Sequence, residues 1–244
     1  MTQPSCTSAL RRPAVFLDRD GTLTEPRHYP SHPEDLVLQE GIGPPLQALQ
    51  HAGFALIVVT NQSGLARGLV DEAAIAPMHR RLQELLARYQ VQLDGIYLCP
   101  HHPDGAVPRF SIACSCRKPA PGMLHQAASD LDCDLPSSWM VGDSICDVDA
   151  GNRAGTRTAL VGPQPLAGVV PTLHRTTTAQ ALSAIAALEI PPARGQDPYA
   201  QGARWPPHPR APRPPALLPK EPPYPSGRPQ PSAHLRAEGP IRDF

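Results

Sequence analysis

Short apolar runs alternate with amphipathic stretches over most of the chain, and this alternation is the feature that most limits its fold. The strand-like runs are Ala14–Leu17, Phe54–Val59, Gly95–Leu98, Trp139–Val141 and Thr158–Val161. The helix-like stretches are Pro44–His51, Asp71–Tyr89, Pro121–Leu131, Ile145–Arg153 and Thr178–Leu188. Such alternation predicts an α/β fold in which a mostly parallel sheet carries helices on both faces.

The longest helical stretch has one regular apolar face. Its large apolar residues recur at spacings of three and four: Ile75, Met78, Leu82, Leu85 and Tyr89. This spacing predicts that all five lie on one buried side of a helix. Pro77 falls inside the stretch, so we expect the helix to begin there or to have a first turn that tolerates proline.

Proline usage divides the 244 residues into a body and a tail. Residues 191–244 hold 16 of the 33 prolines and few large apolar residues, so we expect a disordered tail after a single domain over residues 1–190. The tail carries eight basic and four acidic residues, which leaves 14 basic and 18 acidic residues in the body. An acidic body argues against general nucleic-acid binding, which normally requires a basic face.

The chain shows no signal for a membrane or for secretion. No apolar run approaches the roughly 20 residues of a membrane span, and Met1–Arg12 lacks an apolar signal-peptide core. Three of the six cysteines, Cys99, Cys114 and Cys116, lie close together in the sequence. That distribution favours a metal site in a reducing cytoplasm over a disulfide framework.

Two carboxylates follow the first predicted strand. Asp18 and Asp20 end the run Val-Phe-Leu-Asp-Arg-Asp-Gly-Thr, and Gly21 allows a sharp turn there. Both side chains would leave the pleat at the carboxyl edge of the sheet, where open α/β sheets bind ligands. A simple Asp-Gly turn explains the pair equally well when it is taken alone. The irregular polar segment 22–43 that follows is long enough to form one wall of a pocket.

Three later stretches add polar groups of complementary chemistry. Thr60-Asn61-Gln62-Ser63 ends the second strand, Arg117-Lys118 precedes a helix, and Asp143 follows a further apolar strand. The first of these is by itself ordinary turn chemistry, and the second is an ordinary surface charge pair. Asp147 and Asp149 are explained as favourable charges in the first turn of a helix. Asp143 is harder to explain in this way, because it should lie at the same sheet edge as Asp18. Together, carboxylates, a hydroxyl and a lysine at successive strand ends would hold Mg²⁺ and surround a phosphoryl group with positive charge.

These four stretches, in this order, resemble the motifs of the haloacid dehalogenase (HAD) superfamily of phosphatases over residues 14–162. The resemblance implies a Rossmann-like fold, with Asp18 as the nucleophile that forms an aspartyl-phosphate and Asp20 as the general acid and base. Thr60 and Lys118 would hold the phosphoryl oxygens. Mg²⁺ would lie between Asp18, the backbone carbonyl of Asp20, and Asp143. Since no helical domain is inserted between the motifs, we expect no large cap over the site.

The cysteine-rich stretch contains two ligand pairs. Cys99 and His101 form the first pair and Cys114 and Cys116 the second, which together provide four ligands of the kind that tetrahedral Zn²⁺ prefers. A fully protein-ligated site would be structural and would stabilise the loop. His102 is an alternative ligand to His101, and chance clustering of thiols is the simpler alternative.

The same stretch narrows the resemblance. Cys-Pro-His-His-Pro-Asp-Gly, a long gap and Cys-Ser-Cys-Arg-Lys-Pro are similar to the D-glycero-D-manno-heptose 1,7-bisphosphate 7-phosphatases, and Tyr29 and Gly41 agree. Histidinol-phosphate phosphatases are the nearest alternative, with a shorter span between the ligand pairs. Substrate contacts implied by the resemblance are Arg19, Pro26, Arg27, His28, Tyr29, Asn61, Gln62, Ser63, Arg117, Lys118 and Ser144.

The resemblance also implies a cellular role. A monomeric cytoplasmic enzyme with Mg²⁺ and Zn²⁺ would act on a small sugar bisphosphate during synthesis of nucleotide-activated heptose for lipopolysaccharide and other surface glycans. A third hypothesis, from another class, is a non-catalytic zinc-stabilised binding module whose Pro-rich tail recruits a partner through polyproline II segments. The intact set of Asp18, Asp20, Lys118 and Asp143 argues against it.

Overall fold

A computed structural model describes residues 11–163, 168 and 170–191. The predicted disordered tail lies outside the described residues, except for Pro191, and so do its two Pro-rich runs at 204–209 and 220–225. Across the described part of the chain, no helix combines the length and the apolar composition that crossing a bilayer requires.

Among the described residues, six parallel strands form one sheet in the order β3-β2-β1-β4-β5-β6. The strands are β1 (Ala14–Leu17), β2 (Ala55–Asn61), β3 (Gly95–Cys99), β4 (Trp139–Gly142), β5 (Arg157–Val161) and β6 (Leu173–Arg175). The predicted parallel α/β sheet is therefore confirmed. The sequence did not predict β6, because it has three residues and only one of them is apolar.

In the described part of the chain, six α-helices and three short 3-10 turns lie between or after the strands. The helices are α1 (Gly43–His51), α2 (Ser63–Ala66), α3 (Glu72–Ala87), α4 (Gly122–Asp130), α5 (Ile145–Ala154) and α6 (Thr178–Glu189). The 3-10 turns are Pro33–Asp35, Pro108–Phe110 and Leu135–Ser137. The sequence did not predict α2, which is a single turn directly after the polar residues that end β2.

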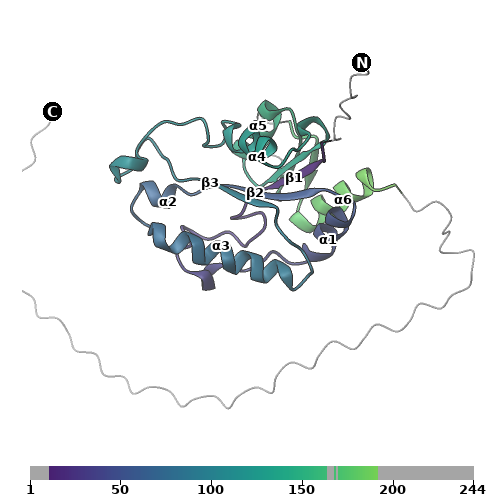
Figure 1. Cartoon of the computed structure of the whole chain (residues 1–244), viewed down its shortest axis with the longest axis horizontal. Helices are drawn as coiled ribbons and strands as arrows, with labels where there is room; N and C mark the ends of the chain where they lie inside the picture. Colours follow the sequence, from purple (N-terminus) through teal and green to yellow (C-terminus); the bar gives the residue numbers. More distant parts are fainter. Residues whose placement is uncertain (1–10, 164–167, 169, 192–244) are drawn as a thin grey trace, which may run out of the picture. The chain divides into compact units, whose positions relative to one another are not determined.

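The sheet is buried on both faces by helices, as predicted (Figure 1). Successive residues of β1 point to opposite faces, since side chains alternate along a strand. Val15 and Leu17 pack in a core with α1, α3 and α6. Ala14 and Phe16 pack in a second core with α4 and α5. This two-sided burial explains why the strands read as continuous apolar runs rather than as alternating ones.

Helix α3 confirms most of the predicted apolar face and corrects two details. Ile75, Met78, Leu82 and Leu85 are buried, but the helix ends at Ala87 and Tyr89 is 46% exposed. The helix begins at Glu72, where the Asp71 side chain caps the amide of Ala73. Pro77 therefore lies in the second turn. The proline cannot donate to the carbonyl of Ala73, and this residue is exposed, so water can take the place of the missing donor.

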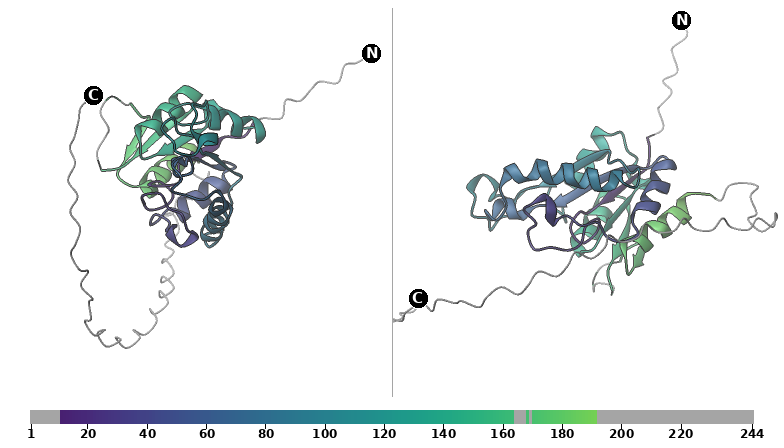
Figure 2. Two further views of the ribbon diagram at one scale, coloured as in Figure 1. Left: turned by 90° about the vertical axis from the view of Figure 1, so that its left-hand side faces the viewer. Right: turned by 90° about the horizontal axis from the view of Figure 1, so that it is seen from below.

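The strand order places a natural binding position between β1 and β4. The chain moves outward from β1 through β2 to β3 and then returns to β4 on the other side of β1. A crevice forms beyond the carboxyl ends of strands at such a reversal. The irregular segment 22–42, predicted as a loop, leaves the end of β1 here and packs its Pro33–Asp35 turn against α3 (Figure 2).

Candidate active site

Asp18 and the end of β4 meet at this reversal of strand order. Asp18 directly follows β1, and its amide donates to the carbonyl of Val141 in β4 at 3.0 Å. Asp143 is the first residue after β4. Asp18 and Asp143 are 125 residues apart in the sequence, yet both lie at the same edge of the sheet, as expected for residues that follow neighbouring parallel strands.

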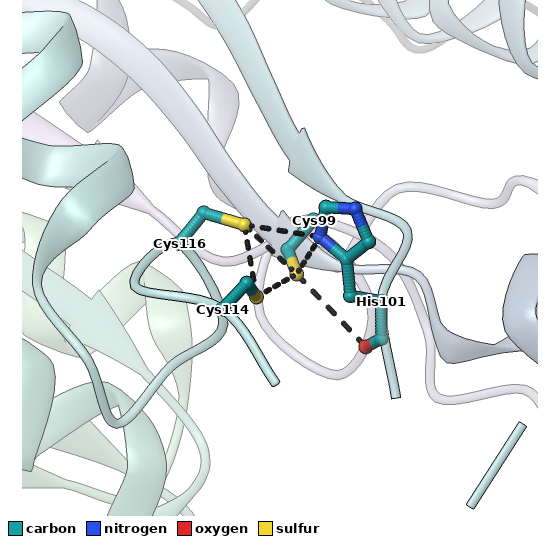
Figure 3. A group of neighbouring side chains, drawn as sticks. All are labelled: Cys99, His101, Cys114 and Cys116. Carbon is teal, nitrogen blue, oxygen red and sulfur yellow. Dashed lines mark hydrogen bonds between the residues drawn. The ribbon is translucent and has the colours of Figure 1, made fainter. Parts of the chain in front are cut away.

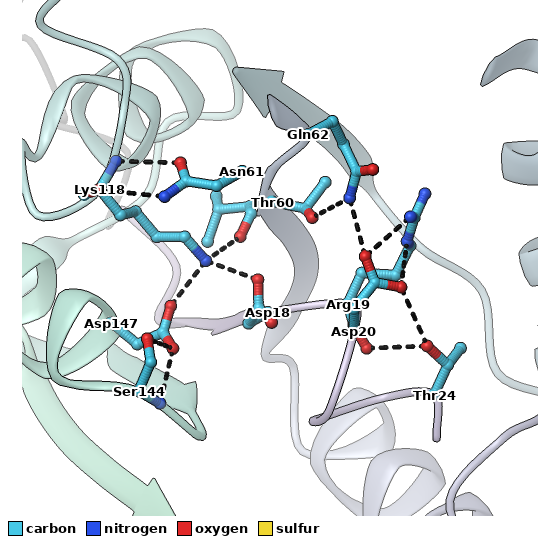
Figure 4. Close-up of polar contacts among 11 residues, drawn as sticks. Asp18, Arg19, Asp20, Thr24, Thr60, Asn61, Gln62, Lys118, Ser144 and Asp147 are labelled. Carbon is cyan, nitrogen blue, oxygen red and sulfur yellow. Dashed lines mark hydrogen bonds and ion pairs between the residues drawn. The ribbon is translucent and has the colours of Figure 1, made fainter. Parts of the chain in front are cut away.

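A buried lysine links two of the carboxylates. Lys118 Nζ lies 2.6 Å from Asp18 Oδ1 and 2.6 Å from Asp147 Oδ1, and it also donates to the carbonyl of Val59 at 2.7 Å (Figure 4). Lys118 is only 2% exposed. The lysine is not at a strand end, contrary to the sequence prediction, but in the loop that leads to α4. A cation at this depth requires partners, and the two carboxylates provide them.

Burial and mutual repulsion shift the ionisation of these groups. Burial, together with the carboxylates of Asp147 and Asp143, raises the pKa of Asp18 to about 7, although Lys118 acts in the opposite direction. Burial disfavours the charged form of Lys118, but Asp147 and Asp18 outweigh it and raise the pKa of the lysine above its usual value. Burial and Asp147 raise the pKa of Asp143 to about 6. The site therefore concentrates more negative charge than one lysine neutralises.

Three carboxylates are arranged to share a cation. Oxygen atoms of Asp18, Asp143 and Asp147 all lie within 4.8 Å of one another. Gly21 leaves room for this arrangement, since a Cβ there would lie 2.1 Å from Asp143 Oδ2, and its φ of +87° also favours glycine. Hard carboxylate oxygens in surplus over local positive charge are the donor set that suits Mg²⁺. The residues present thus fit the ion that the resemblance implies.

Asp20 occupies a different environment from Asp18. Arg19 donates to its two carboxylate oxygens from Nε at 3.0 Å and from Nη2 at 2.8 Å. Gln62 Nε2 donates to the same carboxylate at 2.9 Å, and Thr24 Oγ1 lies 3.4 Å from it. The Arg19 side chain is fully buried, so any contact of this residue with substrate would come from its backbone.

The polar residues that end β2 fix their neighbours. Asn61 exchanges two 3.0 Å hydrogen bonds with the backbone of Lys118 and so sets the position of the lysine. Buried Gln62 also donates to Thr60 Oγ1 at 2.7 Å. Ser63 begins α2 and is partly exposed. The side-chain amides of Asn61 and Gln62 are therefore both engaged in hydrogen bonds within the protein.

The other expected substrate contacts lie around the site with differing exposure. Pro26, Arg27 and His28 are exposed on the 22–42 loop, and Tyr29 is half-buried with φ of +49°. Arg117 donates to the carbonyl of His101 at 3.3 Å. Ser144 immediately precedes α5, and its amide and its hydroxyl both donate to Asp147 Oδ2, at 3.0 and 2.6 Å.

The four expected soft ligands converge in one cluster (Figure 3). The thiols of Cys99, Cys114 and Cys116 are separated by 3.1 to 3.6 Å. His101 Nδ1 lies 3.7 Å from Cys99 Sγ and 3.4 Å from Cys116 Sγ. A tetrahedron with Zn–S bonds of about 2.3 Å has edges of about 3.8 Å, so the cluster fits a zinc ion with little movement.

His102 does not belong to the cluster. Its Nε2 lies 3.2 Å from Nη2 of Arg67, and its Nδ1 accepts from the amide of Asp104 at 3.1 Å. The amides of Ala106 and Val107 both donate to the carbonyl of Ala66 in α2, at 2.7 and 2.9 Å. The loop between the ligand pairs is therefore docked on the segment that follows β2.

Sequence reasoning gave Asp147 too small a role and did not identify Arg67. The sequence predicts Asp147 as a favourable charge in the first turn of a helix and leaves a metal role open, and the structure shows a buried residue that is paired with Lys118. Its position three residues after Ser144 is the spacing of a capping box, which signals local order but not the ion pair. Arg67 had no signal, because its partner is 35 residues away in sequence.

Comparisons with known proteins agree with this site. A protein-family model described as "HAD-hyrolase-like" matches residues 115–163. The D-glycero-beta-D-manno-heptose-1,7-bisphosphate 7-phosphatase of Yersinia pestis is 45% identical over 149 residues, which are 61% of this chain and 79% of the relative. The protein of the same name from Escherichia coli K12 is 44% identical over 149 residues, which are 61% of this chain and 78% of the relative.

Two solved structures share the fold. A HAD-like phosphatase from Mesorhizobium loti has a TM-score of 0.66 and 38% identity, over 73% of this chain and 86% of the other. A D,D-heptose 1,7-bisphosphate phosphatase from B. bronchiseptica, complexed with magnesium and phosphate, has a TM-score of 0.61 and 30% identity, over 71% of this chain and 97% of the other.

The parallel sheet and the carboxylate-lysine set at its edge define the HAD class of phosphatases. Within that class, the chain belongs to the D-glycero-β-D-manno-heptose-1,7-bisphosphate 7-phosphatase family. The resemblance inferred from the sequence motifs is thereby confirmed.

Proposed function

We propose that this protein is a Mg²⁺-dependent phosphatase that removes the 7-phosphate of D-glycero-β-D-manno-heptose 1,7-bisphosphate. The observation that carries the proposal is the buried Asp18–Lys118–Asp147 set beside Asp143 at the reversal of strand order. The names of the relatives support the choice of substrate and of the β anomer.

The reaction would proceed in two steps through Asp18. In the first, a carboxylate oxygen of Asp18 attacks phosphorus in line, a bond from this oxygen to phosphorus forms, and the bond from phosphorus to the 7-oxygen of the sugar breaks. Asp20 gives its proton to the departing oxygen. In the second, Asp20 takes a proton from water, which attacks phosphorus and releases phosphate from Asp18. General acid–base assistance of this kind contributes about 10²–10⁴ in rate.

The remaining residues of the site would position and neutralise the phosphoryl group. Lys118 and the Thr60 hydroxyl would hold its oxygens, and the two hydrogen bonds from Asn61 keep the lysine in place. HAD phosphatases use Mg²⁺, which Asp18, Asp143 and the backbone carbonyl of Asp20 would hold and which would offset charge on the phosphoryl oxygens when bound. Preorganised charge of this kind avoids reorganisation during the reaction.

Substrate recognition would come from the loops around the sheet edge. Arg27, His28 and Tyr29 of one loop, Ser63 and Arg117 would contact the sugar and its second phosphate, and Ser144 lies at the start of α5. No domain is inserted over the site among the described residues, so the far end of a bisphosphate has room.

The Cys99–His101–Cys114–Cys116 cluster would hold a structural Zn²⁺. All four positions of a tetrahedral ion would be filled by protein, which leaves no place for a reacting water. Arg117 and Lys118 follow Cys116 directly, so an ordered cluster restricts where both cations lie. We propose that zinc acts on activity only through this loop.

We further propose a monomer that acts in the cytoplasm. The cysteines of the described residues, Cys99, Cys114, Cys116, Cys133 and Cys146, are all free, which suits a reducing compartment. Light scattering coupled to gel filtration measures the oligomeric state directly.

The decisive comparison is between substrates. Phosphate release would be measured with the heptose bisphosphate and with histidinol phosphate, each with Mg²⁺ and with a chelator. We expect a higher kcat/KM for the bisphosphate and no turnover without metal. A preference for histidinol phosphate would indicate the related phosphatase activity instead. No turnover on any phosphate ester would favour the non-catalytic binding module.

A further inference from the structure

One glycine of the loop between the two cysteine-cluster ligand pairs lies where no side chain fits. A Cβ at Gly105 would lie 2.7 Å from the carbonyl oxygen of Ala66, 3.0 Å from the Ala66 Cβ and 2.6 Å from Oγ of Ser111. The serine hydroxyl can rotate away, but the carbonyl belongs to α2, whose residues Gly64, Leu65 and Ala66 are buried. The absence of a side chain at Gly105 therefore lets the loop reach α2.

Two hydrogen bonds hold the loop at the same point of α2. The amides of Ala106 and Val107 both donate to the Ala66 carbonyl, at 2.7 and 2.9 Å. Ala66 is fully buried and is the last residue of α2, where a carbonyl has no partner within its own helix. The loop amides therefore satisfy this carbonyl, and a Cβ at position 105 would occupy the space that they need.

An apolar contact supports the same docking. Phe110, which ends the 3-10 turn of this loop, packs against a small cluster of buried residues that consists of Leu65, Val70 and Ile75. Leu65 belongs to α2, and this cluster is separate from the two cores that cover the faces of the sheet. The loop is thus docked on α2 by polar bonds beside Gly105 and by apolar packing at Phe110.

A chain of backbone contacts leads from the docked loop to Arg117. The amide of Gly105 donates to the carbonyl of His102 at 3.0 Å, and the amide of His102 donates to the carbonyl of Phe110 at 3.0 Å. The carbonyl of the preceding residue, His101, accepts from Nη1 of Arg117 at 3.3 Å. A shift of Gly105 away from α2 would therefore move the segment whose carbonyl holds the Arg117 guanidinium.

We propose that Gly105 is a positioning residue for Arg117, because it lets the loop dock on Ala66 and so fixes the carbonyl that holds the guanidinium. The proposal rests on the proposed function, in which Arg117 contacts the sugar and its second phosphate. Gly105 itself touches neither substrate nor the reacting atoms. Lys118 is held separately, by the two hydrogen bonds of Asn61, so the site of phosphoryl transfer stays in place when the loop moves.

The kinetic test adds one heavy atom at each of two neighbouring positions. Gly105→Ala places a Cβ against Ala66, whereas Ala106→Ser enlarges an exposed side chain of the same loop and keeps its amide. We expect Gly105→Ala to raise KM for the heptose bisphosphate about tenfold with kcat unchanged, because it weakens a charge-assisted contact made equally in the ground state and the transition state. Ala106→Ser should behave as the wild type.

Inhibition by inorganic phosphate separates this effect from general damage to the site. Phosphate would bind at Asp18 and Lys118, so its inhibition constant should be the same in Gly105→Ala and in the wild type. An unchanged KM in Gly105→Ala, an equal rise of KM in Ala106→Ser, or a fall in kcat together with weaker phosphate inhibition would overturn the proposal.

A structural readout does not depend on turnover. Hydrogen exchange of the Ala106 and Val107 amides, measured by NMR, should be roughly tenfold faster in Gly105→Ala than in the wild type, because both amides lose their acceptor. Elemental analysis should find the same zinc content in the two proteins. Unchanged exchange at these amides, or loss of zinc in the variant, would contradict the inference. Wild-type protein that protects these amides but hydrolyses no phosphate ester would overturn the proposed function, and with it the role of Arg117, while leaving the docking of the loop intact.

Discussion

Two aspartates separated by one residue have different environments in this protein. Asp18 faces Lys118 in the buried part of the site, and Asp20 faces Arg19 and Gln62 at its side. The sequence motif predicted the two carboxylates but not that Lys118 would pair with Asp18. The two carboxylates differ in their partners: Lys118 pairs with Asp18, whereas Arg19 and Gln62 donate to Asp20.

Gly21 should control metal affinity more than folding. In Gly21→Ala, the new Cβ would collide with the carboxylate of Asp143 and the positive φ would add about 1–3 kcal/mol of strain. We expect the Mg²⁺ concentration for half-maximal activity to rise by roughly ten- to a hundredfold, as for other changes that displace a metal ligand. Metal titration of phosphate release measures this.

Gly155→Ala is a matched control. Gly155 also has a positive φ, of +82°, but no atom lies within 4 Å of the position of its Cβ. The substitution should lower stability through the same backbone strain and leave the Mg²⁺ dependence unchanged. Parallel shifts in the Mg²⁺ requirement of both variants would mean that strain, and not the contact with Asp143, is responsible.

His79 should make the protein less stable in mild acid. Burial, and then the positive charge of Arg19, lowers the pKa of this α3 residue to about 4 in the folded state, against about 6.5 unfolded, so protonation favours the unfolded chain. Its contribution is fully present above pH 6.5 and is lost as pH falls toward 4. The full pKa difference would correspond to about 2 kcal/mol between pH 7 and pH 5, and because the imidazole is partly open to solvent, screening reduces the expected loss to about 1 kcal/mol.

Urea unfolding at both pH values tests this linkage. The free energy of unfolding should fall less between pH 7 and pH 5 in His79→Gln than in the wild type, by about 1 kcal/mol. An identical pH dependence in the two proteins would show that His79 titrates normally in the folded state.

Strands were more predictable than short helices. The run Ala14–Leu17 matches β1 to the residue, and the other four predicted strands differ from the observed bounds by one or two residues. Their signal is strong because both faces of the sheet are buried. A helix of one turn such as α2 has no periodicity to detect, and Tyr89 continues a helical spacing after the chain has left α3.

Side-chain contacts between different elements could be predicted only where the residues belong to a recognisable sequence motif. The four ligand atoms of the cysteine cluster could be listed from spacing, and the structure brings them together. The Lys118–Asp147 pair and the docking of Arg67 on His102 depend on tertiary packing, which no local pattern encodes. The prediction that Lys118 lies at a strand end was also wrong, because the residue is in the loop that precedes α4.

Removing the proposed zinc should loosen one loop before the whole fold. Treatment with a strong chelator should increase hydrogen exchange of residues 100–117 and reduce activity, since Arg117 and Lys118 adjoin the cluster. The purified protein should contain one zinc per chain, measured by elemental analysis. Unchanged exchange in this loop after complete removal of zinc would contradict the structural role.

Cysteine variants provide the control. Cys114→Ser removes one ligand and should lose the bound zinc. Cys133→Ser changes a buried thiol outside the cluster and should keep it. If both variants retain zinc, the metal is bound elsewhere.

The protein as a whole should need only its body for catalysis. Every residue to which we assign a role lies between Asp18 and Asp147, within the part that the structure describes. A chain shortened to residues 1–191 should therefore keep the Tm and the kcat/KM of the full chain. A large loss of either would assign a role to the Pro-rich tail.

The central claim is that Asp18 transfers the 7-phosphoryl group of the heptose bisphosphate. Phosphorus NMR of the full-length protein with the β bisphosphate and Mg²⁺ tests it most directly, alongside the near-isosteric variant Asp18→Asn. We predict that the wild type removes the resonance of the 7-phosphate, keeps that of the 1-phosphate and releases inorganic phosphate, while Asp18→Asn leaves both resonances in place. Turnover by Asp18→Asn at the wild-type rate, or loss of the 1-phosphate first, would contradict the account.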